Sequence, residues 1–289
     1  MTVEQNKTLI ETYFQTIWNE GRFAEEPRFV DEHVVVHAPP IPGIPDGIAG
    51  PLAIVGTFRA AMPDIHLVND DLFGEGATVI QRWTASGTHT GEPLFGVAPT
   101  GARLTMTGIN EFRLADGRIV NAGASWMPPG SCDSWGSCPP KPDPVRSHEE
   151  ERPMTQEAKA IRQRYHEAWN AGDPGALDSI MTPDVVNHSP LPGQPDGIAG
   201  FKGAMMSMRA GVPDLTITIQ SSVAEGDKVS TRWTGTGTHA GSLMGIPATG
   251  KRVTVSGIDI CRVADGYMVE YWQELDTLSM LQQLGVIPS

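Results

Sequence analysis

Basic residues are scarce in this sequence. There are 21 Lys and Arg against 34 Asp and Glu, which gives a formal net charge of −13 at pH 7. Such a chain repels phosphate backbones and anionic lipid, so we expect no nucleic-acid partner. Long apolar runs are also missing: no stretch approaches the roughly 20 residues that span a bilayer. Residues 1–15 carry charges where a signal peptide would be apolar. We therefore expect no membrane partner and a cytoplasmic location.

Cysteine is rare as well. Three cysteines in 289 residues are too few for a disulfide framework. Cys261 lies in a strand-like run, whereas Cys132 and Cys138 lie in a polar, Pro-rich stretch. A Cys132–Cys138 bridge suits their spacing, but a reducing compartment disfavours it, and the sequence leaves both states open. We find no Ser-His-Asp order, Gly-rich phosphate loop or Cys/His zinc spacing, so we expect no cofactor and no metal.

What the sequence does contain is a long internal repeat. The hexapeptide Pro45–Gly50 recurs as Pro195–Gly200, displaced by 150 residues. Other pairs keep that spacing within one residue, among them Trp18-Asn19 with Trp169-Asn170, Pro63-Asp64 with Pro213-Asp214, Arg82-Trp83-Thr84 with Arg232-Trp233-Thr234, and Gly87-Thr88-His89 with Gly237-Thr238-His239. Solenoid repeats have periods of about 20–50 residues, so each copy here should be a complete domain. The sequence predicts a tandem duplication.

The domain boundaries follow from composition. We place the first domain at residues 1–126 and the second at residues 155–289. Residues 127–154 contain Pro-Pro pairs, Gly-Ser and a run of three Glu, which is typical of a linker. The second copy continues beyond its last strand into Leu278–Leu284, where leucines at helical spacing predict a short helix.

Each copy begins with a helical pattern and ends with a strand pattern. Apolar residues recur at i, i+3 and i+4 in residues 5–20 and 156–171, which indicates amphipathic helices. After Pro213 the pattern alternates, and Gly-containing turns separate several such runs. This order predicts an α+β fold. We expect two tandem cone-shaped domains, each a curved antiparallel sheet covered by N-terminal helices, with a small-molecule pocket between sheet and helices.

Six motifs in the second copy closely resemble the SnoaL-like polyketide cyclase family, also called ester cyclases. They are Trp169–Gly172, Pro183–His188, Gly237–Gly241, Gly245–Gly250, Arg262–Gly266 and Gln283–Gly285. The resemblance covers residues 155–289 and, less completely, residues 3–126. It implies the cone-shaped fold of nuclear-transport-factor-like proteins and cofactor-independent intramolecular aldol closure of a polyketide ester. Other proteins of this fold are epoxide hydrolases, dehydratases, isomerases or simple binding proteins, so the fold does not settle the chemistry.

The candidate catalytic residues lie on two neighbouring strands. Strand alternation places Asp259 and Gln273 on the same side of the sheet. The resemblance implies that Asp259 stands where characterised cyclases carry a catalytic His, and Gln273 where they carry an acid/base Asp. Because Gln cannot titrate, the family mechanism cannot transfer intact. We therefore predict Asp259 as the general base, with Asn187, His188 or Gln273 donating to the developing enolate. Structural pairing of Asp259 with a neighbouring polar group is equally open.

Five further residues are predicted to contact substrate. The resemblance implies a hydrogen-bonding role for Asn187, with a capped turn before Pro190 as the structural alternative. His239 lies in a Gly-Thr-His turn that His89 repeats in the first copy, so a structural role competes with a binding role. The other three are the aromatic residues Tyr165, Trp169 and Tyr271. Tyr165 and Trp169 lie on the first helix of the second copy, where aromatic residues at helical spacing usually pack in the core, so the core is their alternative role.

The first copy has fewer titratable groups at the matching positions. Asn110 stands for Asp259 and Ala124 for Gln273. We therefore predict that the first domain is degenerate, being mainly structural or holding a different ligand, and that the second is the active one.

The predicted function is that of a cofactor-independent cyclase acting on a polyketide-like small molecule by general acid/base chemistry. An isomerase, dehydratase or hydrolase of the same fold, or a non-catalytic small-molecule binding protein, are the alternatives. Single-domain relatives dimerise through their sheets, so we also expect the two domains to pack as an intramolecular pseudo-dimer.

Overall fold

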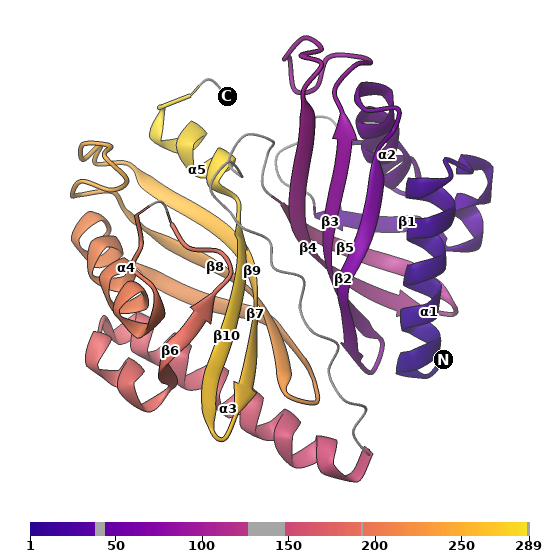
Figure 1. The fold of residues 1–289 in the computed structure, drawn as a ribbon. Helices are drawn as coiled ribbons and strands as arrows, with labels where there is room; N and C mark the ends of the chain where they lie inside the picture. Colours follow the sequence, from indigo (N-terminus) through magenta and orange to yellow (C-terminus); the bar gives the residue numbers. More distant parts are fainter. Residues whose placement is uncertain (38–43, 127–147, 192, 288–289) are drawn as a thin grey trace. The chain divides into compact units, whose positions relative to one another are not determined.

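A computed structural model of the chain describes residues 1–37, 44–126, 148–191 and 193–287. The chain divides into two compact units, Met1–Lys141 and Pro142–Ser289, which we call the first and second domains (Figure 1). Cys132 and Cys138 lie outside the described residues, so their pairing stays a prediction. Cys261 is a buried free cysteine in the second domain.

The first domain places its short helices before its longer strands. The helical elements are α1 (Val3–Tyr13), the π-helix η1 (Phe14–Asn19), the 3-10 helix η2 (Phe23–Arg28) and α2 (Ala49–Ala61). The strands are β1 (Val30–His37), β2 (His66–Glu75), β3 (Thr78–Thr88), β4 (Arg103–Ala115) and β5 (Arg118–Trp126). They form one five-stranded sheet in the order β1-β5-β4-β3-β2.

The second domain repeats this plan and adds a helix at its end. Its helical elements are α3 (His148–Ala171), η3 (Pro174–Ser179), α4 (Gly197–Gly211) and α5 (Thr277–Leu284). Its strands are β6 (Met181–Asn187), β7 (Thr216–Glu225), β8 (Lys228–Thr238), β9 (Arg252–Ala264) and β10 (Tyr267–Leu275), in the order β6-β10-β9-β8-β7. Helix α5 forms where the leucine spacing predicted it. Helix α3 begins at His148, inside the predicted 127–154 linker.

Both sheets are mixed, which the sequence did not predict. The four longer strands of each domain pair antiparallel, as alternation and turns indicated. The short first strand pairs parallel to the last one, β1 with β5 and β6 with β10. A helix follows each short strand, so no tight turn forces it to run antiparallel to a neighbour. The α+β class itself is confirmed, and each sheet is curved with helices on one face (Figure 1).

The repeated Trp-Asn dipeptide docks a helix onto a strand. Asn19 donates through Nδ2 to the Leu67 carbonyl at 3.0 Å and accepts from the Leu67 amide at 2.8 Å. In the second domain Asn170 makes the same two bonds to Ile217, at 2.9 and 2.7 Å. A side-chain amide that pairs with both backbone groups of one residue fixes the helix end against the sheet edge. This motif is therefore structural in both copies.

The first helix of the first domain carries one extra residue. Five positions separate Tyr13 from Trp18, whereas four separate Tyr165 from Trp169. The structure absorbs the insertion in the π-helix η1, whose last turn is closed by a bond from the Glu20 amide to the Gln15 carbonyl. Such bulges are frequent at functional sites because they shift side chains relative to a regular helix.

The hydrophobic core of each domain lies between the helices and the covered sheet face. Helix α1 packs on β2 and β3, and α3 packs on β7, β8 and β9. No helix among the described residues is long and apolar enough to cross a membrane. Nor, within those same ranges, do three or more His, Cys, Asp or Glu side chains converge as a metal site requires.

Candidate functional site

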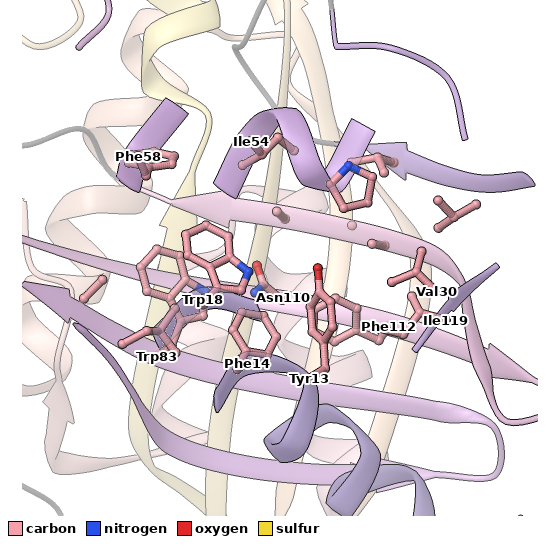
Figure 2. A pocket seen from close by; sticks show the side chains of 18 of the residues that line it. Tyr13, Phe14, Trp18, Val30, Ile54, Phe58, Trp83, Asn110, Phe112 and Ile119 are labelled. Atoms are coloured by element: carbon pink, nitrogen blue, oxygen red, sulfur yellow. The ribbon is translucent and has the colours of Figure 1, made fainter. Parts of the chain in front are cut away.

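A pocket lies inside the first domain, between the π-helix, α2 and the covered face of the sheet (Figure 2). It encloses about 80 Å³ and its wall is mainly apolar. The lining side chains come from the end of α1, the π-helix, α2 and all five strands, and they include Tyr13, Phe14, Trp18, Val30, Ile54, Phe58, Leu67, Trp83, Met106, Asn110, Phe112, Ile119, Ala122 and Ala124. An apolar cavity with a few polar groups is the usual form of a small-molecule site.

Small residues on β5 make room for this pocket. Ala122 lies opposite Phe112 and Ala124 opposite Asn110. In the second domain the equivalent positions carry Tyr271 and Gln273. The Tyr271 ring is buried in the core, with its centroid 5.3 Å from that of Phe201. The two alanines thus leave empty the space that a tyrosine and a glutamine occupy in the other copy.

One polar group in the pocket has no partner. Trp83 is only 6% exposed, and its indole Nε1 finds no hydrogen-bond acceptor among the described residues. Gly108 lies opposite it on β4, where a Cβ atom would collide with the indole ring. In the second domain the equivalent Trp233 donates to Asp259 Oδ2 at 2.9 Å. With Asn110 in place of that aspartate, the buried Trp83 Nε1 has no acceptor among the described residues.

Asn110 belongs to a short chain of amides. Its Nδ2 donates to Gln81 Oε1 at 2.8 Å, and Gln81 Nε2 donates to Asn69 Oδ1 at 2.5 Å. These neutral amides hold Asn110 in place without bringing a charge into the interior. Asn110, Trp18 and Trp83 all line the pocket and are labelled in Figure 2.

A buried acid lies behind the pocket wall. Glu26, on η2, is fully buried, and the Tyr13 hydroxyl donates to its Oε1 at 3.2 Å. Its second oxygen, Oε2, has no partner within the described part of the chain. Burial raises the pKa of Glu26 to about 7, and the bond from Tyr13 only partly opposes this. The second domain has the apolar Leu177 at this position.

The core of the second domain contains a buried ion pair. Asp259 is 1% exposed and Arg162, from α3, is 2% exposed. Arg162 donates to both carboxylate oxygens of Asp259, through Nε at 3.0 Å and through Nη2. Trp233 and the Tyr271 hydroxyl also donate to Oδ2, the latter at 3.2 Å. Burial raises the pKa of Asp259, while the Arg162 guanidinium and these donors act to lower it.

These contacts favour the structural alternative for Asp259. A general base needs a free lone pair aimed at substrate. Both oxygens of Asp259 are instead bonded to protein donors, and Arg162 compensates the charge. Gln273 lies opposite Asp259 in register, as strand alternation predicted, and donates to the Tyr271 hydroxyl at 2.8 Å. The structure thus brings Asp259, Tyr271 and Gln273 together, and a catalytic role for them stays a prediction.

Of the two predicted residues on β6 and its end, only His188 lies apart from that cluster, because Asn187 pairs in register with Tyr271 on β10. Asn187 accepts from the Ser189 amide at 3.0 Å, which is the turn-capping arrangement. His188 pairs through Nε2 with Glu270 Oε2 at 2.9 Å. Its ring stacks on that of Trp272, with 4.4 Å between the ring centroids. Glu270 and Trp272 alternate with Tyr271 along β10, so His188 lies on the opposite side of the sheet from Asp259. The structure does not bring His188 and Asp259 together.

The other predicted contacts have structural partners. His239 is buried in its turn, where Nδ1 lies 3.0 Å from Thr249 Oγ1. Tyr165 is buried and packs its ring 6.2 Å from that of the half-buried Trp169. Both observations suit the core or turn alternatives that the sequence left open.

Several buried polar residues escaped the sequence analysis, among them Glu26, Arg162 and His166. Arg162 and His166 are four residues apart on α3, on the same face as the predicted core residue Tyr165. Burial, and then the charge of Arg162, lower the pKa of His166 to about 3, so the imidazole is neutral. Polar residues at i and i+4 on an apolar helix face were the available signal. Glu26 gave no such signal in the sequence, because the segment around it is polar.

Comparisons with known proteins agree with this architecture. The model of the SnoaL-like polyketide cyclase family matches residues 8–124 and 159–284. No curated protein sequence matches the chain. Solved structures that resemble it include TsrD from Streptomyces laurentii (35% identity, TM-score 0.43), which matches 46% of this chain and 97% of its own.

A second similar structure is a proposed polyketide cyclase from Bacillus cereus ATCC 10987, with 32% identity and a TM-score of 0.42 over 51% of this chain and 94% of its own. A third is IdmH, a proposed polyketide cyclase from Streptomyces antibioticus, with 36% identity and a TM-score of 0.41 over 44% of this chain and 98% of its own. Because the family model matches twice and covers most of the sequence, the chain belongs to the SnoaL-like polyketide cyclase family as a tandem of two domains.

Proposed function

We propose that this protein binds an oxygenated, largely apolar molecule of polyketide type in the pocket of its first domain and closes a ring in it by cofactor-independent acid/base chemistry. The observation that carries the proposal is the unpartnered Trp83 Nε1 in a mainly apolar pocket. A buried donor without an acceptor costs about 1–3 kcal/mol. A ligand carbonyl or enolate oxygen placed there would remove that cost, so the pocket favours oxygenated ligands over hydrocarbons.

This assignment places the site in the domain that the sequence predicted to be mainly structural. The reason is physical: the second-domain cluster satisfies its own charge, whereas the first-domain pocket is open and has an unused donor. An aldol closure needs a base for an acidic C–H, a donor for the enolate oxygen and an acid for the new alkoxide. The Trp83 indole N–H would serve as the donor for the enolate oxygen.

A non-catalytic binding protein is the second candidate. The pairing of Asp259 with Arg162 favours it, because that pairing removes the carboxylate that the sequence nominated as base. Both candidates require that the pocket binds ligand, and they differ in whether a bound carbonyl compound loses a proton there.

The binding claim is tested with 2-tetralone, a bicyclic, mostly apolar ketone, by isothermal titration calorimetry on the full chain. Trp83→Phe keeps the aromatic ring and removes the donor, so affinity should fall about 2- to 10-fold, the value of one hydrogen bond. Ala122→Tyr restores the residue found at the equivalent second-domain position and should abolish binding by filling the pocket.

Trp272→Phe, on the opposite side of the second-domain sheet from Asp259, is the matched control and should leave the affinity unchanged. Unaltered binding in both Trp83→Phe and Ala122→Tyr would place the ligand elsewhere and refute the proposal.

A further inference from the structure

Tyr13 and Glu26 form a hydrogen-bonded pair with one end in the pocket. The Tyr13 side chain lines the cavity, and its ring and hydroxyl lie among the other lining residues in Figure 2. The same hydroxyl lies 3.2 Å from Glu26 Oε1. Glu26 itself is fully buried and does not line the pocket. A proton could therefore pass between a bound molecule and Glu26 only by way of the tyrosine.

The surroundings leave Glu26 without a cation. Its 3-10 helix packs against η1, which has no titratable residue, and against β1. The titratable residues of β1 are exposed or half-exposed: Asp31, Glu32, His33 and His37. On its own helix, Glu25 and Arg28 pair with each other at the surface. Burial is accordingly the main cause of the raised pKa, which at about 7 suits proton exchange near neutral pH.

The pair is specific to the first domain. Tyr165 occupies the position of Tyr13 in the other copy, but Leu177 replaces Glu26 there. Conversely, Asp259 and Arg162 of the second domain are replaced by Asn110 and an isoleucine in the first. Both domains thus contain buried carboxyl groups, and Glu26 is the one that the structure shows bonded to a residue lining the first-domain cavity.

We propose that Tyr13 is a catalytic residue that exchanges a proton with a carbonyl compound in the first-domain pocket, with Glu26 as the positioning residue that holds Tyr13 and takes up its proton. The proposal rests on the proposed function of this pocket and names the acid/base groups that serve it. The substrate class is a ketone or ketoester with an acidic C–H next to the carbonyl.

The proton steps balance without a further reactant. The substrate C–H proton moves to the Tyr13 oxygen as the Tyr13 proton moves to the Glu26 carboxylate, and the C–H electron pair becomes the enolate. The enolate carbon then attacks a second carbonyl of the same molecule and forms the C–C bond. The new alkoxide takes a proton from Tyr13, which regains one from Glu26. The net change is an isomerisation, with both residues restored.

The test measures exchange of the C1 hydrogens of 2-tetralone for deuterium in D2O, followed by NMR on the full chain. Exchange should be faster with protein than without it, and its rate should rise as pH increases through about 7 because Glu26 must be ionised. Glu26→Gln keeps an acceptor for Tyr13 but cannot titrate. It should lower the rate about 10²- to 10⁴-fold, the usual effect of losing acid/base catalysis. Tyr13→Phe should do the same.

Glu25→Gln, on the same 3-10 helix but at the surface, is the matched control and should change neither rate nor pH profile. Calorimetry on each variant separates the two proposals, because both Glu26→Gln and Tyr13→Phe should bind 2-tetralone within about twofold of the parent. The catalytic role of Tyr13 and Glu26 would be refuted if the parent bound 2-tetralone without catalysing exchange, or if neither substitution changed the exchange rate. Either result would still agree with ligand binding in the first-domain pocket. Absence of binding in the parent overturns the proposed function itself.

Discussion

Glu26 and Asp259 are two buried carboxyl groups that the fold treats in opposite ways. Asp259 is neutralised by Arg162 and accepts from Trp233 and a tyrosine. Glu26 has one hydrogen bond from Tyr13 and no described cation within reach. The first arrangement fixes a charge permanently, because breaking the ion pair would leave Arg162 alone in the interior. The second allows the carboxyl group to gain and lose a proton near neutral pH.

The raised pKa of Glu26 predicts a pH-dependent stability. Its folded value of about 7 exceeds the ordinary value of 4.5, so the folded state holds the proton more tightly than the unfolded chain does. The associated stability is full below about pH 4.5, declines as the pH rises and is lost above about 7. Between pH 5 and 8 the first domain should lose about 2–3 kcal/mol of its free energy of unfolding from this group.

Glu26→Gln should remove that component of the pH dependence and make the first domain more stable than the parent at pH 8. Urea unfolding of parent and variant at pH 5 and pH 8 measures the free energy of unfolding of the first domain. An identical pH dependence in parent and variant would show that Glu26 titrates normally.

The pairing of Asp259 predicts a second stability effect. Asp259→Asn leaves the Arg162 charge buried and uncompensated, which should destabilise the second domain by about 3–5 kcal/mol. Adding Arg162→Ile recreates the residue pair that the first domain carries at these positions and should recover much of the loss. Denaturant unfolding of the single and double variants checks this. An Asp259→Asn variant as stable as the parent would contradict the structural role of Asp259 and favour its role as general base.

At the scale of elements, the π-helix marks where the copies diverged. The extra residue lies between Tyr13 and Trp18, both of which line the pocket. Because the bulge absorbs the insertion, the residues before it keep the same buried face as in α3: Asn6, Ile10 and Tyr13 correspond to Ala158, Arg162 and Tyr165. Without the bulge, one inserted residue would rotate that face by about 100°.

Deleting Thr16 should therefore be tolerated. It would convert the π-helix into a regular α-helix like α3, and the midpoint of thermal unfolding of the first domain should fall by less than about 8 °C, equivalent to about 1 kcal/mol. Deleting Glu167 from the regular helix α3 is the matched control. It would rotate the buried face away from the sheet and should prevent the second domain from folding, as circular dichroism would show. Equal tolerance of both deletions would contradict this account of the bulge.

Helices and antiparallel strands could be predicted from the sequence because their periodicities are local. The parallel pairing of β1 with β5 could not, since two distant segments meet there without a turn between them. A pocket between sheet and helices was expected in each domain, but the sequence favoured the second domain as the site, whereas the pocket described here lies in the first. From the sequence, Ala124 indicated only the loss of Gln273, whereas in the fold Ala122 and Ala124 leave space unfilled near the unpartnered Trp83. Whether space is empty depends on side chains from several elements at once.

At the scale of the whole molecule, duplication has produced two domains of one architecture with different interiors. The second holds a buried ion pair where the first holds a cavity. Duplication allows this because one copy can lose a function while the other keeps or changes it. The tandem arrangement also raises the concentration of each domain near the other to the order of millimolar.

We therefore predict that the two domains associate as an intramolecular pseudo-dimer. A protease site introduced between residues 127 and 147 would cut the chain while leaving the family-matched segments 8–124 and 159–284 intact. The two fragments should remain together on a sizing column. Fragments that elute separately would show that the domains are independent and that the tether alone links them.

The central claim is that the first-domain pocket is the ligand site. A crystal structure of the full chain with 2-tetralone tests it most directly. The account predicts electron density for the bicyclic ring between the π-helix and β5, with the ketone oxygen within hydrogen-bond distance of Trp83 Nε1 and the C1 carbon facing Tyr13. Density instead beside Asp259 and Gln273 in the second domain, with an empty first-domain pocket, would contradict the claim.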